Sequence, residues 1–248
     1  MRALLLSSLL LLFLGGCVTS NPYTSRSQLM LIDKKEELKM GREASEEILK
    51  NSKKSSNMQA TRRVMEVGTK IARVAEQSDF AWEFHLIEDP SINAFCLPGG
   101  KVFVYTGILT LVESDDELAV VMGHEIAHAI ARHGAERLSV SMASELGRNL
   151  IGIALDMKQP QSKKLFDTAY GVGMNVGVML PYSRAQELEA DRIGLLLMKR
   201  AGYNPNAALT FWEKMRANQG GGKGSDFLST HPSDSKRIEA IRQAIPSL

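Results

Sequence analysis

The sequence has few cysteines, little net charge and no long apolar run after its first residues. Its 248 residues contain two cysteines, Cys17 and Cys96, so a framework of several disulfides is excluded and a hydrophobic core must supply the stability. Lys and Arg number 30 against 28 Asp and Glu, with the two signs interspersed. This balance gives no basic surface for nucleic acid. Beyond the N-terminal segment no run of about twenty apolar residues occurs, so we expect no membrane-spanning helix.

The N-terminal segment is typical of a lipoprotein signal peptide. Arg2 precedes a Leu-rich run that ends in Gly15-Gly16-Cys17. We expect residues 1–16 to be removed and Cys17 to be acylated, so that lipid holds the chain at a membrane. The alternative is an ordinary secreted protein with a cysteine at this position. Residues 18–28 lack apolar periodicity and predict a tether within 17–32, followed by one folded domain over 33–248.

A metal site is indicated by His124-Glu125-Ile126-Ala127-His128. Two histidines four apart lie on one face of a helix, so both rings can reach a single ion at about 2.0–2.1 Å. Glu125 would lie beside this ion, where a carboxylate acts as general base toward a water molecule. The apolar flanks and the acidic residues after Ser114 predict a buried, capped helix. The alternative is a chance match within a core helix.

A third ligand is predicted on a helix that includes residues 184–191. Glu187 and Asp191 are four apart and share a face, whereas Glu189 lies about 200° from Glu187 and points elsewhere. One of the pair would bind the ion and the other would orient a ligating histidine. Spacing alone does not say which. The alternative is a solvated face with a surface pair between Arg184 and Glu187.

Other elements follow from the hydrophobic pattern. We expect helices over 33–50, 58–76 and 139–157, and strands over 82–87 and 101–105 that form a hairpin before the metal helix. A peptide substrate usually binds along an exposed strand edge, which makes Asn93, Ala94 and Phe95 candidates for substrate binding. Asn93 could instead serve turn formation. The glycines within 163–180 indicate close packing or a lid.

The remaining histidines and Cys96 need separate interpretations. Helical spacing turns His133 away from His124 and His128, so a packing or capping role is expected for it. His85 alternates with apolar neighbours and should lie on the surface. Cys96 is expected to be a small buried hydrophobe. His231 follows a glycine-rich segment and precedes a final helix.

Together these residues resemble the HtpX-like and CAAX-prenyl-protease-like zinc endopeptidases, including LoiP/BepA-type bacterial lipoproteins and Oma-type relatives. The resemblance covers most of the chain and rests on the metal helix and on several short motifs: Asn93-Ala94-Phe95, Pro98-Gly99-Gly100, Val102-Phe103-Val104, Thr106-Gly107, Ser183-Arg184, Glu187 with Asp191, and His231-Pro232 with Arg237. It implies a predominantly helical α+β zincin fold, gluzincin-like, with a small β-hairpin sheet beside the active-site helix.

The resemblance also implies roles for particular residues. One zinc ion would be bound by His124, His128 and Glu187, with Glu125 as base and Asp191 behind a ligand. His231 would approach the zinc and close the site or support catalysis. Arg237 would stabilise the oxyanion or serve a structural role.

The expected function is a lipid-anchored endopeptidase that removes misfolded or membrane-proximal proteins of the bacterial envelope. Val18 rather than Asp follows Cys17, which favours the outer over the inner membrane, on the periplasmic face. Its partners would be polypeptide substrates and the lipid membrane, with no nucleic acid. The sequence shows neither the transmembrane helices nor the tetratricopeptide repeats of some relatives. Two alternatives are an assembly chaperone for outer-membrane proteins with secondary or gated proteolysis, and an inert metal-binding lipoprotein.

Overall fold

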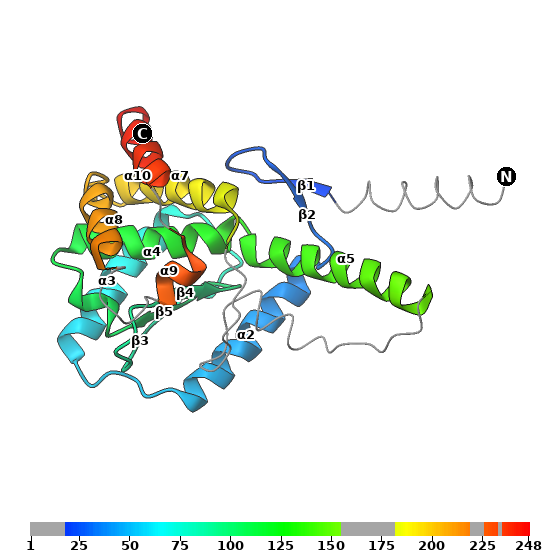
Figure 1. Ribbon diagram of the computed structural model, residues 1–248. Coiled ribbons are helices and arrows are strands. Elements are labelled where there is room, and N and C mark those ends of the chain that lie inside the picture. The colour runs from blue at the N-terminus through cyan, green and yellow to red at the C-terminus, as the bar shows by residue number, and fades with distance from the viewer. Residues whose placement is uncertain (1–17, 155–181, 219–225, 233–234) are drawn as a thin grey trace.

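The computed structural model describes residues 18–154, 182–218, 226–232 and 235–248. Within these ranges helices predominate and enclose one small sheet, so the expected helical α+β class is confirmed (Figure 1). The expected signal peptide at 1–16, Cys17, and the glycine-containing segment 163–180 lie outside the described residues. None of the described helices combines the length and apolar character needed to cross a bilayer.

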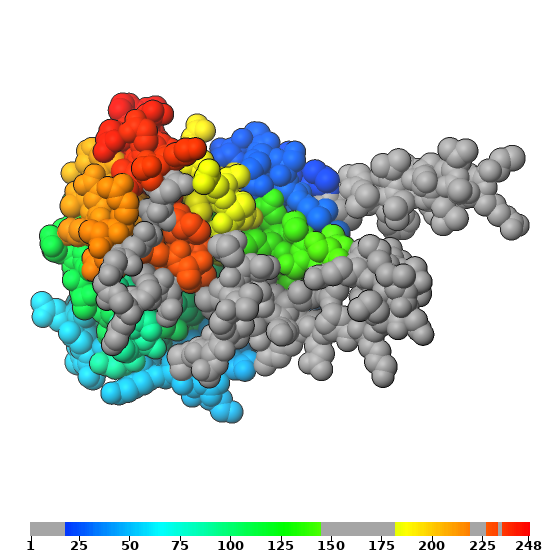
Figure 2. All heavy atoms as spheres, in the orientation of Figure 1, coloured from blue at the N-terminus to red at the C-terminus, as the bar shows by residue number. Residues whose placement is uncertain are grey.

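The segment that we expected to be a tether is partly folded. Strands β1 (Val18–Ser20) and β2 (Ser27–Leu29) pair antiparallel. Gln28 is buried, and its side-chain amide donates to the carbonyl oxygen of Ala131 at 2.8 Å. Figure 2 shows this N-terminal hairpin in blue, against the green start of helix α5 (His133–Ala154) and the yellow helix α7 (Arg184–Arg200). The tether prediction was wrong here because polar side-chain hydrogen bonds hold the segment, and these leave no apolar period.

The central sheet has three strands in the order β3-β5-β4. Strand β4 (Ala94–Leu97) pairs antiparallel with β5 (Lys101–Tyr105), and β3 (Glu83–Ile87) pairs parallel with β5. The hairpin therefore joins β4 to β5, and not the two strands that we predicted. We missed β4 because all four of its residues are buried, which removes the alternation of a half-exposed strand. Gly99 and Gly100 make the turn with φ of 79° and 83°, which favours glycine.

Helices cover both faces of this sheet. On one face, α3 (Met58–Val74) and α4 (Asp115–Ile130) pack with the strands and with α7 into the main core. On the other face, α2 (Lys34–Asn51) covers a smaller cluster around Phe103. Helices α8 (Ala207–Ala217) and α10 (Ser235–Ala244) pack beside α4 and α7. Helix α9 (Asp226–Thr230) lies in front of α4 in Figure 1, and its Phe227 N–H donates to the carbonyl oxygen of Ile92, just before β4. Short 3₁₀ turns span Ile108–Thr110 and Ile245–Ser247.

Helix α4 lies in the middle of the molecule, as its apolar flanks predicted. Ser114 caps it by accepting from the backbone N–H of Glu117, and every residue from Glu117 to Ile130 is buried. Ser183 caps α7 with a capping box completed by Gln186. These two capped helices carry most of the polar residues discussed below.

Candidate metal centre

Helix α4 supplies two histidines to a buried cluster. His124 and His128 are each 2% exposed, and their Nε2 atoms lie 3.0 Å apart. An apolar core helix places these rings among hydrophobic neighbours, so they need a polar or charged partner there.

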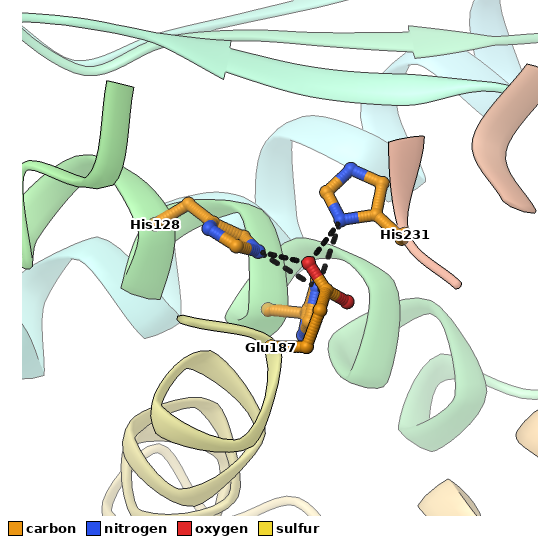
Figure 3. Close-up of side chains that lie close together, drawn as sticks. His128, Glu187 and His231 are labelled. Atoms are coloured by element: carbon orange, nitrogen blue, oxygen red, sulfur yellow. Dashed lines mark hydrogen bonds and ion pairs between the residues drawn. The ribbon is translucent and has the colours of Figure 1, made fainter. Parts of the chain in front are cut away.

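Helix α7 and the segment after α9 complete the cluster. The Glu187 carboxylate lies 3.2 Å from His128 Nε2 and 3.5 Å from His124 Nε2. His231 Nδ1 lies 3.1 Å from Glu187 Oε1 and 3.2 Å from His124 Nε2. In Figure 3 the rings of His128 and His231 approach the Glu187 carboxylate from two sides. Residues more than 100 positions apart in the sequence thus meet at one point.

This cluster fits a divalent metal ion. Ligands at about 2.0–2.1 Å in a tetrahedron are about 3.3 Å apart, close to the 3.0–3.5 Å separations that we observe. One ligand atom from each of His124, His128, Glu187 and His231 lies within 4.8 Å of the others. Neutral imidazole nitrogens and a carboxylate oxygen all offer lone pairs, and a cation satisfies lone pairs that face one another.

The electrostatics keep three of the four donors in a ligating form, whereas the fourth, His124, holds a proton at pH 7 that a metal ion would have to displace. Burial lowers the pKa of His231 to about 4 and that of His128 well below its ordinary value, so both rings are neutral at pH 7. Burial alone would raise the pKa of Glu187, but Arg237 and the nearby histidines hold it well below the ordinary range. Burial likewise lowers the pKa of His124, but the carboxylates of Glu187 and Asp191 outweigh this and raise it to about 9.

Glu125 lies beside the donors and is not one of them. Its Oε1 is buried, accepts no hydrogen bond from the described residues, and lies 3.5 Å from His231 Nε2. Burial raises the pKa of Glu125 to about 8. A carboxylate with a pKa near neutrality can both accept and return a proton, as a general base requires.

Asp191 lies behind His124, as expected for a residue that orients a ligand. Its Oδ1 is 3.0 Å from His124 Nδ1, which leaves His124 Nε2 directed at the cluster. Arg237 donates to both Asp191 oxygens at 2.6 and 2.8 Å, and its Nη1 lies 2.5 Å from Glu187 Oε2. The oxyanion role considered for Arg237 does not match these contacts, because its guanidinium is directed at carboxylates of the cluster. Arg237 instead holds Asp191 and Glu187 in place.

His133 was assigned a packing or capping role, yet the structure places it against a candidate ligand. Its Nδ1 lies 2.8 Å from His128 Nδ1, and its Nε2 lies 2.8 Å from Glu189 Oε2. Helical spacing failed here because α4 ends at Ile130 and Arg132 has a φ of 57°, so the chain turns before His133. Glu189 does point away from the donors, as predicted, but into this second contact.

The sequence analysis also missed Tyr182. The Tyr182 ring stacks on the His128 ring, with the two ring centroids 3.8 Å apart. The guanidinium carbon of Arg137 lies 3.5 Å from the centroid of the Tyr182 ring. A tyrosine directly before the capped α7 carried no signal in the sequence. Its place beside His128 makes it part of the wall of the cluster.

The candidate substrate-binding residues lie on and beside β4, the strand at one end of the described sheet. Asn93 and Ala94 are buried, and the Asn93 carbonyl accepts from Tyr105 N–H at 3.0 Å. Phe95 stacks on Phe103 with centroids 5.0 Å apart, on the α2 side of the sheet. The Phe95 side chain thus lies in the core, and the substrate-binding prediction for these residues concerns their backbone at the edge of β4.

Two further interpretations can be compared with the structure. Cys96 is a buried free thiol whose pKa is raised by burial, in agreement with a small core residue. His85 was expected on the surface, but it is half-buried, with its ring 5.0 Å from that of Phe103. The Phe103 ring packs against a residue that strand alternation placed outside.

The family can be named from the sequence around this centre. Residues 58–245 match peptidase family M48. The chain belongs to this family. The M48 match includes every residue of the buried donor cluster and the residues behind it on α5, α7 and α10.

Relatives of this M48 chain include mitochondrial and bacterial proteases. It is 46% identical over 184 residues to mitochondrial metalloendopeptidase OMA1 of Schizosaccharomyces pombe, covering 74% of this chain and 52% of that protein. It is 32% identical over 247 residues to mitochondrial OMA1 of Homo sapiens, covering 91% and 45%. It is 30% identical over 187 residues to the beta-barrel assembly-enhancing protease of Escherichia coli, covering 73% and 38%. The chain thus spans about half or less of these relatives.

Proposed function

We propose that this M48 chain is a zinc-dependent endopeptidase. The observation that carries the proposal is the position of Glu125, a buried carboxylate with a raised pKa beside a set of four metal donors. Zinc suits this set because it accepts nitrogen and oxygen ligands in tetrahedral geometry. The names of the relatives, metalloendopeptidase and protease, support the reaction type.

The mechanism follows from the positions of the side chains. When bound, zinc supplies a Lewis acid that polarises the peptide carbonyl and lowers the pKa of a water molecule. Glu125 takes the proton from the attacking water and passes it to the leaving amine. Asp191 and Arg237 keep His124 and Glu187 directed at the cluster, so the donors need not reorganise during the reaction. The outer edge of β4 would hold the extended peptide through backbone hydrogen bonds.

His231 supports a resting state in which the site is closed. A catalytic metal site keeps one position open, but here four protein donors converge. We propose that the His231 ring occupies this position until a peptide displaces it. Removal of the ring would then free the position.

The proposed substrates are misfolded or membrane-proximal proteins of a bacterial envelope. The leader sequence with Cys17 supports a lipid anchor, and the similarity to a beta-barrel assembly-enhancing protease supports a role in the envelope. The anchor would place the chain on the periplasmic side, at the outer membrane. Its partners would be substrate polypeptides and lipid.

A second candidate function is assistance in protein assembly, with proteolysis held back. The observation that favours it is the presence of His231 among the donors, since a closed site would hold back cleavage. An inert metal-binding lipoprotein would have the same closed cluster. These alternatives predict little turnover of any peptide bond.

Cleavage of an unfolded protein separates these functions. The purified full chain, loaded with one equivalent of Zn²⁺, should hydrolyse casein at internal bonds, stop after chelation, and recover when Zn²⁺ is restored. Absence of cleavage at full zinc occupancy, both in the wild type and in His231→Ala, would exclude the endopeptidase. If restored Zn²⁺ brings back binding of casein but no cleavage, the assembly role is favoured.

The anchor has its own test. Cys17→Ser removes the acylated thiol, so the variant should stay unprocessed or leave the membrane fraction. Density fractionation of an expressing bacterium measures this and also separates the outer from the inner membrane. A Cys17→Ser protein that fractionates and migrates like the wild type would exclude the lipoprotein assignment.

A further inference from the structure

We propose that His133 and Glu189 form a relay that orients His128, and that Arg26 of the N-terminal hairpin holds this relay. The contacts run from the buried donors outward through three side chains. No part of the relay belongs to the donor set itself. The proposal concerns positioning of a ligand and depends on a metal ion at the cluster, but on neither the substrates nor the location proposed above.

The hydrogen-bond directions along the relay are mutually consistent. His128 Nε2 faces Glu187 and His124, so it must carry a lone pair to ligate an ion. Its proton then lies on Nδ1, which is 2.8 Å from His133 Nδ1 and can donate to it. His133 is left with its proton on Nε2, 2.8 Å from Glu189 Oε2. The chain of donors therefore ends on a carboxylate, the strongest acceptor available.

His124 has a similar arrangement, but without an intervening histidine ring. His124 Nδ1 contacts Asp191 directly, and Arg237 holds Asp191. His128 reaches Glu189 through His133, and Arg26 Nε donates to Glu189 Oε2 at 2.8 Å. Each of the two α4 histidines thus has a carboxylate behind it, and each of these carboxylates is paired with an arginine. Such carboxylates fix the tautomer and ring orientation of a ligating histidine and raise its basicity.

The outer end of the relay is built by the N-terminal hairpin. Arg26 lies between β1 and β2 and also pairs with Glu136 through two contacts of 2.6 Å. The Thr24 hydroxyl donates to the other oxygen of Glu189. Glu189 is 6% exposed, and His133, Thr24 and Arg26 together occupy both of its carboxylate oxygens. The hairpin seen in Figure 2 against α5 and α7 is therefore a part of the metal centre.

Metal affinity tests the relay with a matched control. Glu189→Gln keeps the size of the side chain and removes the charge, and His133→Phe keeps a ring and removes both nitrogens. Glu136→Gln is the control, because Glu136 pairs with Arg26 as Glu189 does, whereas the carboxylate that accepts from His133 is that of Glu189. The full-length variants are titrated with Zn²⁺ against a chelator of known affinity, and the visible spectrum of bound Co²⁺ is recorded at saturation.

The relay predicts that Glu189→Gln and His133→Phe weaken Zn²⁺ binding, within the roughly 10- to 100-fold range known for residues behind metal ligands. Both should change the Co²⁺ spectrum, because the ligand field at His128 changes. Glu136→Gln should share any loss of thermal stability but keep the affinity and spectrum of the wild type. If His133→Phe does not fold, Glu189→Gln decides. A loss below about fivefold, or an equal loss in Glu136→Gln, would overturn the relay.

Discussion

Gly123 and Gly194 bring helices α4 and α7 into backbone contact beside the metal centre. A Cβ atom added at Gly194 would lie 3.0 Å from the carbonyl carbon of Gly123 and 3.1 Å from the backbone nitrogen of His124. Gly123 directly precedes a candidate ligand, and Gly194 is one turn beyond Asp191. The absence of side chains at this crossing therefore sets the distance between the ligands of the two helices.

Gly194→Ala should loosen this crossing. Alanine favours a helix by about 1 kcal/mol over glycine, but the new methyl group meets backbone atoms, and overpacking of this kind costs about 1–3 kcal/mol. We expect a net loss of up to about 2 kcal/mol in the free energy of unfolding, together with weaker metal binding. Urea unfolding of the metal-free protein and a chelator titration measure the two effects. Arg192→Ala, exposed on the same helix, is the control. A variant more stable than the wild type would contradict the account.

Glu187→Ala removes the only carboxylate in the donor set. We expect the variant to lose its metal during dialysis, because two or three neutral histidines bind a divalent ion more weakly and Arg237 becomes a poorly compensated charge. Metal content per chain, measured by elemental analysis, gives the result. Glu213→Ala, an exposed carboxylate on α8, should retain a full equivalent. Full retention in both variants would show that Glu187 is not a ligand.

His231→Ala tests whether the His231 ring closes the site. The ring touches Glu187 through Nδ1 and approaches Glu125 through Nε2, so it stands between the donors and the base. If it blocks the open position, the variant should keep its metal and cleave casein faster at matched occupancy. Initial rates decide the matter, and a rate at or below that of the wild type would contradict the gate.

Local geometry made part of this centre predictable from sequence. His124, Glu125 and His128 lie within one helix, where spacing fixes direction, and capping residues located the helix start at Ser114. Spacing also placed Glu187 and Asp191 on one face and Glu189 off it. Spacing could not show which of Glu187 and Asp191 binds the ion and which orients a histidine, because that depends on how α7 crosses α4.

The residues behind His128 were beyond sequence reasoning for a different reason. Arg26, Glu136 and Glu189 meet across 110 and 163 positions through polar contacts, which leave no hydrophobic period. His133 follows a turn with positive φ, so the helical wheel gave it the wrong direction. Strand β4 was hidden because full burial removes alternation. In each case tertiary contacts, and not local propensity, decided the structure.

The role of Glu125 is the central claim, and Glu125→Gln tests it most directly. The substitution keeps the size of the side chain and the donor set intact but removes the group that accepts the proton. At one equivalent of bound Zn²⁺ in both proteins, we predict that the initial rate of casein hydrolysis falls at least about 100-fold in the variant. A variant that keeps its metal and cleaves at close to the wild-type rate would contradict the mechanism.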